Sequence, residues 1–343
     1  MTRLVALDEV RDAASRLASV TVRTPLVPFP GTNVLVKPES LQPTGAFKLR
    51  GAYAAISALS AAERERGVVA HSSGNHGYAV AYAARLLGVK AAVVVPRTAP
   101  SVKTDAIEAC GAELVRVEPT LAARVQAAGE IERARGYAQI PPFEDARVIA
   151  GQGTIGLEIA EDVVSAAAPA SGPDGDREAA LKPEAEGPAA VLVPVSGGGL
   201  ISGIAVAVKA LLPGTRVIGV EPELAADARD SLRQGFPVGW PAADVARTAA
   251  DALRVEKVGD LTFAHIRALV DDIVTVTEEQ IFTTVRRLAL EARLVAEPGG
   301  AVAVAAALEL DEARPVVAVL SGGNISPDLL ARVLAGTNES YTG

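Results

Sequence analysis

The sequence contains a single cysteine, Cys110, among its 343 residues. One cysteine excludes a disulfide framework and a cysteine-based zinc site, and it favours a reducing compartment, so we expect a cytoplasmic protein. Positive charge is also scarce, because 33 Lys and Arg face 41 Asp and Glu, for a net charge of −8. In the absence of a basic run, nucleic acid is not an expected partner.

Long hydrophobic runs are missing as well. The longest apolar stretches, such as residues 301–308, are too short to cross a bilayer, so no membrane partner is expected. Residues 1–20 carry charges on a helical pattern and lack the apolar core of a signal peptide. Hydrophobic residues still make up 49% of the chain, with only 3% aromatic. An Ala- and Val-rich composition of this kind suits helices packed closely over a β-sheet.

Short apolar segments alternate with Ala-rich helical patterns along most of the chain. The expected strands form two series: 68–70, 91–95 and 113–117, then 191–195, 216–220, 273–276 and 316–320. Both series are rich in valine and lack polar alternation, which is typical of parallel strands buried on both faces. We therefore predict an α/β protein with two open, mainly parallel twisted sheets and a ligand cleft between them.

The two series predict two domains. We assign residues 67–147 to a small α/β domain, and residues 1–66 plus 148–343 to a large one. Residues 165–188 interrupt the order because they are rich in Ala, Pro, Gly, Asp and Glu and have little to bury. This segment is expected to be a flexible surface loop between a helix and a strand.

Lys48 stands in a setting that a surface lysine does not need. An apolar strand at 34–36 leads into a Pro/Gly turn, and Lys48 follows Phe47 at the start of an Ala-rich helix. Both the helix dipole and desolvation disfavour a charged amine there. A neutral lysine amine is the nucleophile that forms a Schiff base with a carbonyl cofactor. The alternative is a solvated lysine on a helix face, and the loops described next argue against it.

The segment 71–77 reads His-Ser-Ser-Gly-Asn-His-Gly and lies between an expected strand and an expected helix at 78–87. It gathers hydroxyls, an amide and free backbone N–H groups at a helix N-terminus, which suits an anion such as a substrate carboxylate. An ordinary helix cap would need only one such residue. The composition of this loop therefore favours a binding site.

The segment 196–200 reads Ser-Gly-Gly-Gly-Leu and precedes an expected helix at 201–212. Consecutive glycines let several N–H groups approach a phosphate at a helix N-terminus. The loop is not a Walker A motif, and Ser202 stands where a dinucleotide fingerprint needs glycine. A third segment, Ser-Gly-Gly-Asn at 321–324, follows the last expected strand and faces the same edge. Alone it is a weak signal, because Ser-Gly-Gly is common in turns.

Acidic residues follow the strand expected at 216–220. Two carboxylates and a backbone carbonyl within 221–227 could ligate Mg²⁺ or Ca²⁺, although solvated loop acids are an equal alternative. Glu297 is either a buried acid near the cleft or a helix cap. The three histidines show no metal-binding spacing.

Taken together and in this order, these segments resemble the fold-type-II pyridoxal-phosphate enzymes, whose fold is that of the tryptophan synthase β chain. The most similar branch is the serine/threonine dehydratase (ammonia-lyase) and serine racemase family. Residues 149–154, 221–222 and 276–278 match further stretches of that family. The resemblance covers nearly the whole chain.

The resemblance implies a role for each matching residue. Lys48 would hold pyridoxal 5′-phosphate as a Schiff base and later act as general base, Phe47 would pack on the pyridine ring, and Ser321 would bond its nitrogen. Asn75 would bond the phenolic oxygen. The phosphate would be cradled by Ser196, Gly197, Gly198, Gly199 and Leu200. The substrate carboxylate would be bound by Ser72, Ser73, Asn75 and His76. The divalent metal would be bound by Glu221, the carbonyl of Ala225 and Asp227.

The resemblance also implies the reaction. We expect a lyase that converts a β-hydroxy amino acid, such as serine, threonine or 3-hydroxyaspartate, to a 2-keto acid and ammonia. Racemisation is the nearest alternative if Ser73 delivers a proton to the opposite face. A distant alternative is an NAD-dependent oxidoreductase, with Glu221 as the ribose-binding acid. Homodimers or higher homo-oligomers are usual for such folds.

Three departures from the family pattern matter. Ser196 replaces the first of four glycines, which is tolerable if its φ is negative. Residues 248–252 read Thr-Ala-Ala-Asp-Ala where Thr-Ile-Ala-Asp-Gly is common. Nothing after Gly343 supplies a regulatory domain, so feedback by isoleucine is not expected.

Overall fold

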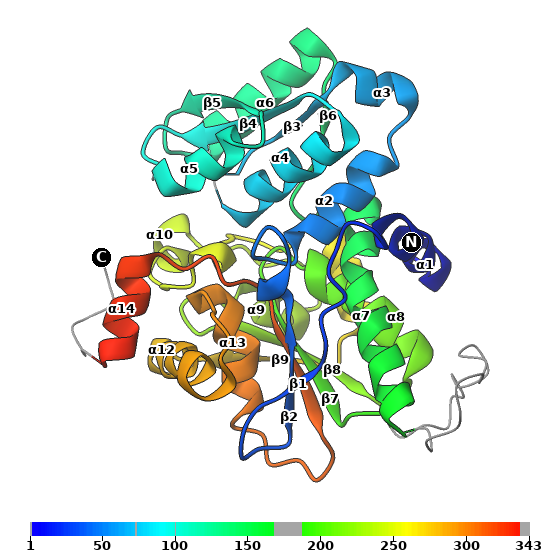
Figure 1. The fold of residues 1–343 in the computed structure, drawn as a ribbon, viewed down its shortest axis with the longest axis vertical. Helices are drawn as coiled ribbons and strands as arrows, with labels where there is room; N and C mark the ends of the chain where they lie inside the picture. The colour runs from blue at the N-terminus through cyan, green and yellow to red at the C-terminus, as the bar shows by residue number, and fades with distance from the viewer. Residues whose placement is uncertain (1, 73, 100, 168–186, 337–343) are drawn as a thin grey trace.

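The computed structural model describes residues 2–72, 74–99, 101–167 and 187–336, which contain two sheets (Figure 1). The six-stranded sheet has the order β1 (Val27–Pro28), β2 (Val34–Pro38), β10 (Val316–Leu320), β7 (Ala190–Pro194), β8 (Arg216–Pro222), β9 (Asp272–Val276). The four-stranded sheet has the order β5 (Glu113–Val117), β4 (Ala91–Pro96), β3 (Val68–Ala70), β6 (Ala138–Gln139). All strand pairs are parallel except β1 with β2. The predicted α/β fold with mainly parallel sheets is confirmed.

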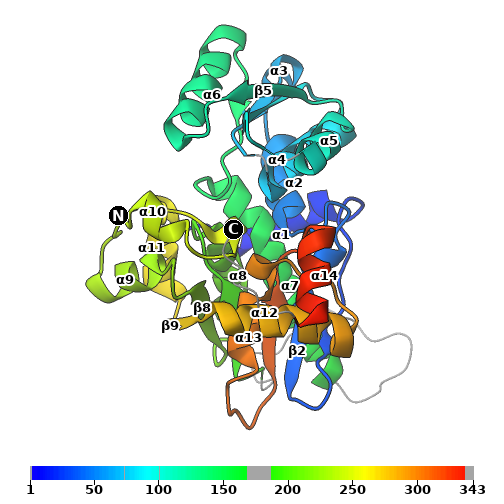
Figure 2. The same cartoon turned by 90° about the vertical axis from the view of Figure 1, so that its left-hand side faces the viewer.

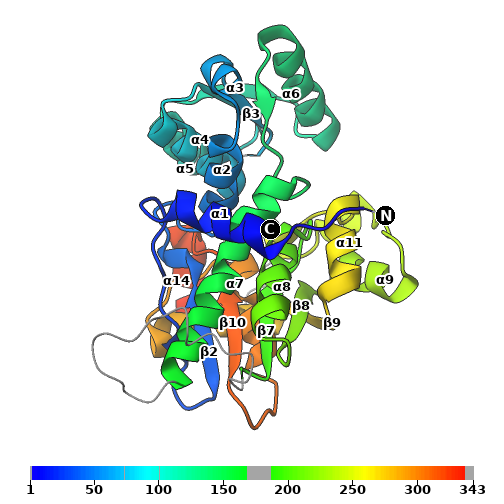
Figure 3. The same cartoon turned by 90° about the vertical axis from the view of Figure 1, so that its right-hand side faces the viewer.

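The six-stranded sheet is buried on both faces, which explains its valine-rich strands. Within β10, Ala318 and Leu320 face one hydrophobic cluster, whereas Val317 and Val319 face the other. The first cluster includes residues of α12 (Glu278–Arg287) and α13 (Pro298–Ala307), which Figure 2 shows on one side of the sheet. The second includes residues of α7 (Ala146–Ala167), α8 (Gly199–Leu211) and α11 (Asp260–Leu269), on the opposite side in Figure 3. We call this sheet and its helices the large lobe.

The four-stranded sheet forms a second layered unit, the small lobe. On one face Val93 and Val95 pack with residues of α4 (Asn75–Leu87) and with Ile107 of α5 (Ser101–Glu108). On the other face Val94 packs with residues of α6 (Leu121–Arg135). The short helix α3 (Ala61–Arg66) precedes the first strand of this sheet. The predicted boundaries of the small domain at 67 and 147 stay a prediction, because a strand order does not by itself define a domain.

The chain passes between the lobes through α2 (Lys48–Ser57), which packs on both α4 and α7 (Figure 1). Helix α1 (Leu7–Leu17) lies against α7. The remaining helical segments are η1 (Glu39–Leu41), α9 (Asp227–Gln234), α10 (Ala242–Val245), η3 (Asp251–Leu253), η4 (Leu288–Ala292) and α14 (Pro327–Ala335). Among the described helices, none combines the length and the apolar character that a membrane span requires.

The helices begin earlier than the sequence suggests. Helix α4 starts at Asn75 rather than at residue 78, and α8 starts at Gly199 rather than at 201. In both cases the last residues of the predicted loop already form the first helical turn. The N–H groups of that turn have no partner within the helix, so they stay available to a ligand. Helix α7 continues to Ala167, so the interruption predicted from residue 165 begins later. Most of that predicted loop, 168–186, lies outside the described residues.

Candidate functional site

Lys48 is the first residue of α2, and the turn before it is held by the end of β10. The N–H of Phe47 donates to the carbonyl of Ser321 at 3.0 Å, and Gly323 N donates to Gly45 O at 2.8 Å. Ala46 and Gly322 form an isolated antiparallel bridge. Two segments that are far apart in sequence, the Lys48 turn and 321–324, are therefore brought together by backbone hydrogen bonds.

The amine of Lys48 is placed against carbonyl and aromatic groups. Its Nζ donates to the carbonyl oxygen of Pro142 at 2.9 Å and lies 4.9 Å from the ring centre of Phe47. Burial lowers the pKa of Lys48 from 10.5 to about 8. The neutral amine is therefore accessible near neutral pH, in the direction that the sequence predicts.

Asn75 joins the small lobe to the Lys48 turn. Its Nδ2 donates to Oε1 of Glu297 at 2.6 Å, and its Oδ1 accepts from Nδ2 of Asn324 at 2.8 Å. Asn324 Nδ2 also donates to the carbonyl of Thr44 at 2.9 Å. Glu297 is only 5% exposed and also occupies the N-cap position of α13, where its side chain makes no capping hydrogen bond. Both predicted alternatives therefore hold: the residue is a buried acid, and it stands at a helix start. The amide of Asn75 is thus fixed by two large-lobe side chains.

The other residues of the 72–76 loop differ in their exposure. Ser72 is partly buried, and its Oγ accepts from Gly74 N at 3.3 Å. His76 is buried, and its Nε2 lies 2.8 Å from the carbonyl of Ile140. Burial, with the charge of Lys48 second, lowers the pKa of His76 to about 3, so the ring is neutral and donates this bond. Ser73 lies outside the described residues. The substrate-binding role assigned to this loop stays a prediction.

The glycine loop is closely covered by Phe143. A Cβ atom on Gly197 would lie 2.1 Å from the Phe143 ring, and one on Gly199 would lie 2.9 Å from the Phe143 Cβ. Gly198 has a φ of 89°, which favours glycine. Ser196 is not among the described residues with positive φ. A serine is therefore tolerated at this position, where the family pattern has a glycine. The turn therefore needs its glycines, and it leaves the first N–H groups of α8 for an anion.

Two residues near Lys48 and the glycine loop were missed by sequence reasoning. Pro142 and Phe143 belong to the segment that returns from β6 to α7, and they contact Lys48 and the glycine loop respectively. No motif marks them in the sequence. Their role follows only from the way the chain crosses back between the lobes.

The predicted metal ligands lie together at the start of α9. Glu221 accepts from the N–H groups of Ala228 at 3.0 Å and Arg229 at 2.8 Å. Burial raises the pKa of Glu221 well above its usual value, and Asp227 adds to this; burial also raises the pKa of Asp227 to about 7.

Oδ2 of Asp227 is buried with no hydrogen-bond partner among the described residues. Two acids that resist ionisation, one with an orphaned oxygen, fit a divalent cation. The site offers only two carboxylates and a carbonyl, and no group of three His, Cys, Asp or Glu gathers within the described ranges. Occupancy stays a prediction.

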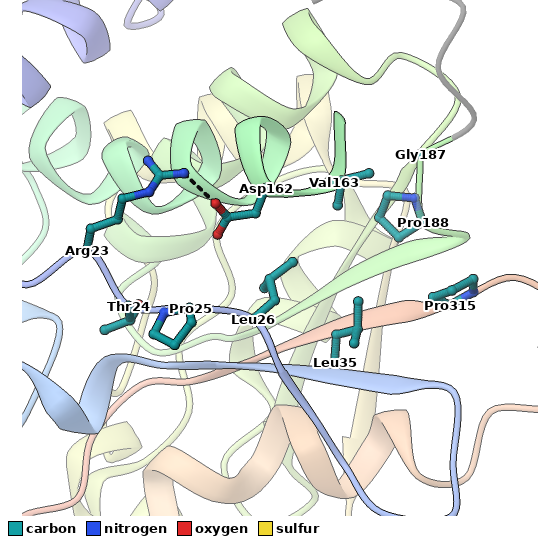
Figure 4. Close-up of a pocket in the computed structure, with 10 residues that line it drawn as sticks. All are labelled: Arg23, Thr24, Pro25, Leu26, Leu35, Asp162, Val163, Gly187, Pro188 and Pro315. Atoms are coloured by element: carbon teal, nitrogen blue, oxygen red, sulfur yellow. Dashed lines mark hydrogen bonds and ion pairs between the residues drawn. The ribbon is translucent and has the colours of Figure 1, made fainter. Parts of the chain in front are cut away.

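A cavity of about 620 Å³ lies away from all of these residues (Figure 4). It is lined by residues between the N-terminal segment, β2 and the end of α7, with Arg23 and Asp162 paired at one end. None of the predicted site residues lines it. The site is therefore defined by converging side chains and helix N-termini rather than by this cavity.

The family model described as pyridoxal-phosphate dependent enzyme matches residues 18–322. The chain belongs to this family. Its cofactor is accordingly pyridoxal phosphate, and the predicted resemblance is confirmed, which removes the NAD-dependent alternative. The residues present fit the cofactor: a desolvated amine at Lys48, a glycine loop opening α8, and Asn75 and Ser321 near the lysine turn.

Individual relatives cover almost all of the chain. An L-threonine ammonia-lyase of Thermotoga maritima is 40% identical over 96% of this chain and 78% of its own length. An L-threo-3-hydroxyaspartate ammonia-lyase of Saccharomyces cerevisiae is 35% identical, with 97% of this chain and 98% of that protein covered. The solved structure of maize serine racemase has a TM-score of 0.85 at 33% identity, covering 97% of this chain and 98% of that one. The fold-type-II assignment is confirmed.

Proposed function

We propose that this protein is a pyridoxal-phosphate-dependent ammonia-lyase that converts a β-hydroxy amino acid to a 2-keto acid and ammonia. The observation that carries the proposal is the Lys48 amine beside Phe47 and the Ser321 segment, because burial lowers its pKa to about 8. Relatives named as threonine and 3-hydroxyaspartate ammonia-lyases support threonine and 3-hydroxyaspartate as substrates, and a relative named serine racemase supports serine.

Each group of residues has a distinct task in this reaction. When bound, the cofactor supplies the electron sink that makes the substrate α-proton acidic. Lys48 Nζ takes that proton, for which a pKa of about 8 is well matched. The first turn of α4 and Ser72 hold the substrate carboxylate, and the first turn of α8 holds the cofactor phosphate. The β-hydroxyl takes up a proton and leaves as water. The enamine that is released then tautomerises to an imine, which one water molecule hydrolyses to the 2-keto acid and ammonia.

Ser321 decides how strong the electron sink is. A hydroxyl at the ring nitrogen, unlike a carboxylate, does not hold that nitrogen protonated. The weaker sink favours prompt loss of the β-hydroxyl over transamination. Elimination is therefore the main reaction in this proposal.

Racemisation is the second candidate, because the chain is similar to maize serine racemase over nearly its whole length. It would require Ser73 to exchange a proton on the face opposite to Lys48. We further propose that Glu221, Asp227 and the Ala225 carbonyl hold Mg²⁺ or Ca²⁺, and that the protein acts in the cytoplasm as a homodimer or higher homo-oligomer. The orphaned Asp227 oxygen supports the metal site, and the single cysteine, Cys110, supports the cytoplasmic location.

The test is keto-acid and ammonia release from a panel of D- and L-serine, threonine and 3-hydroxyaspartate. Chiral chromatography of the remaining amino acid measures racemisation in the same samples. We expect a visible chromophore that borohydride bleaches irreversibly, and a Lys48→Ala variant that folds but has lost at least about a thousandfold in turnover. A colourless wild-type protein, or a Lys48→Ala variant with full activity, would contradict the proposal.

A further inference from the structure

Arg50 is a fully buried arginine two positions after Lys48 on α2. Its Nε donates to Oε2 of Glu39 at 2.8 Å, and its Nη2 donates to Oε1 of the same carboxylate at 2.8 Å. Arg50 is 1% exposed and Glu39 is 0% exposed. Glu39 precedes the lysine turn and Arg50 follows it. This two-pronged ion pair therefore joins the two ends of the segment that carries Lys48.

The pair belongs to a charge-balanced cluster. Glu158 of α7 accepts from Arg50 Nη1 at 2.6 Å and from Lys37 Nζ at 2.7 Å, and Thr24 Oγ1 donates to Glu39 Oε1 at 2.9 Å. Glu39 and Glu158 thus balance Arg50 and Lys37. Asp162, which pairs with Arg23, lies a further 4.0 Å from Lys37 Nζ. Removing one member of such a buried set leaves an uncompensated charge, which is strongly destabilising. The cluster therefore holds its side chains in fixed positions. Thr24, which donates to Glu39, also lines the cavity of Figure 4.

The helix geometry links this cluster to the amine. Arg50 N donates to Phe47 O at 3.0 Å, which closes the first turn of α2. Successive residues of an α-helix are about 100° apart around its axis, so positions 48 and 50 lie on nearly opposite sides. Fixing the Arg50 side chain against Glu39 and Glu158 therefore fixes the direction in which Lys48 leaves the helix, toward Pro142.

We propose that Arg50, through its paired contact with Glu39, is a positioning residue for Lys48. It touches neither the substrate nor the cofactor, and it acts by setting the rotation of the first turn of α2. This inference rests on the proposed function, in which Lys48 moves the α-proton. A displacement of about 1 Å at a reacting group can cost roughly a hundredfold in rate, so a slight turn of the helix would suffice.

The test compares Arg50→Lys with Lys37→Met in the purified holoenzyme. Arg50→Lys keeps the charge but loses the planar two-pronged contact. Lys37→Met removes a second cation from Glu158, but from β2 rather than from the helix of Lys48. Melting temperatures are measured for both. Keto-acid release then gives kcat and KM, and the dependence of kcat on pH shows the titration of Lys48.

We expect Arg50→Lys to lower kcat about 10- to 100-fold with KM changed less than about threefold, and to move the kcat pH profile toward higher pH. Lys37→Met should lose a similar amount of thermal stability and keep kcat within about threefold. Glu39→Gln serves as a second variant and should follow Arg50→Lys. Equal kcat losses in Arg50→Lys and Lys37→Met, or unchanged kcat in Arg50→Lys, would overturn the inference. A wild-type chromophore that borohydride does not bleach would instead refute the proposed function.

Discussion

The Lys48 side of the junction between the lobes is built largely from backbone contacts, whereas the Asn75 side depends on side chains. Phe47, Gly45 and Ala46 bond the backbone of 321–323, and Gly197 packs directly under Phe143. Asn75 instead reaches across through its amide to Glu297 and Asn324. Backbone hydrogen bonds hold the cofactor side of the site rigidly, like a fixed wall. Side-chain hydrogen bonds can instead break and form again when a substrate binds. The difference suggests that cofactor affinity depends on the first side and substrate handling on the second.

Gly197→Ala should have the largest effect among single changes to the glycine loop. The new Cβ would lie 2.1 Å from the Phe143 ring, so either the ring or the loop must move. Overpacking of this kind costs about 1–3 kcal/mol, and we expect cofactor affinity to fall roughly 10- to 100-fold. The measurement is absorbance titration of the apoprotein with pyridoxal phosphate.

Gly214→Ala is the matched control, because nothing lies within 4 Å of a Cβ at that position. It should leave cofactor affinity unchanged. If Gly197→Ala binds the cofactor as tightly as Gly214→Ala does, the rigid-wall interpretation is wrong.

Asn75→Ala should raise KM more than it lowers cofactor affinity. The variant loses a hydrogen bond to a carboxylate, of the kind worth about 1.5–3 kcal/mol, and a second one to Asn324. We expect kcat/KM to fall about tenfold or more. Asn75→Asp should be worse, because it places a second carboxylate against Glu297. Steady-state kinetics measure the effect on KM, and the cofactor titration measures the effect on cofactor affinity. A loss confined to cofactor affinity would contradict the proposed difference between the Lys48 side and the Asn75 side.

Attachment of the cofactor should follow the titration of Lys48. The rate of Schiff-base formation by the apoprotein is expected to rise with pH through a midpoint near 8, rather than near the 10.5 of a solvated lysine. Because the pKa is lower in the folded state, the unfolded chain binds more protons between these values, and the stability of the apoprotein should increase with pH across that window. Stopped-flow absorbance measures the rate. A midpoint above 10 would show that the amine is solvated.

Chelation is expected to have the smallest effect. If Glu221 and Asp227 hold a cation, EDTA should lower the melting temperature of the wild-type protein by roughly 3–6 °C. Glu221→Gln should melt lower from the outset, since Glu221 also accepts two N–H groups of α9, and it should then be insensitive to EDTA. Equal sensitivity in both proteins would place the cation elsewhere.

Much of the site could be predicted because its elements are local. Lys48 after a Pro/Gly turn, the polar loop before α4 and the glycines before α8 each combine a strand end with a helix start within a few residues. The helix starts were placed two or three residues late, because Asn75 and Gly199 look like loop residues although they already form the first turn. Glu297 could not be assigned, since an acid before Pro298 is equally suited to capping a helix.

The sequence by itself determined the two valine-rich parallel sheets, the lysine, the glycine loop and the chemistry that they imply, because strand burial and turn formation depend on nearby residues. Only the tertiary structure decided that the Pro142 carbonyl accepts a hydrogen bond from the Lys48 amine and that Phe143 covers the glycine loop. It also decided that Arg50 pairs with Glu39 and Glu158. Those contacts join segments from different parts of the chain, and their partners are selected by how helices pack and how buried charges must be balanced.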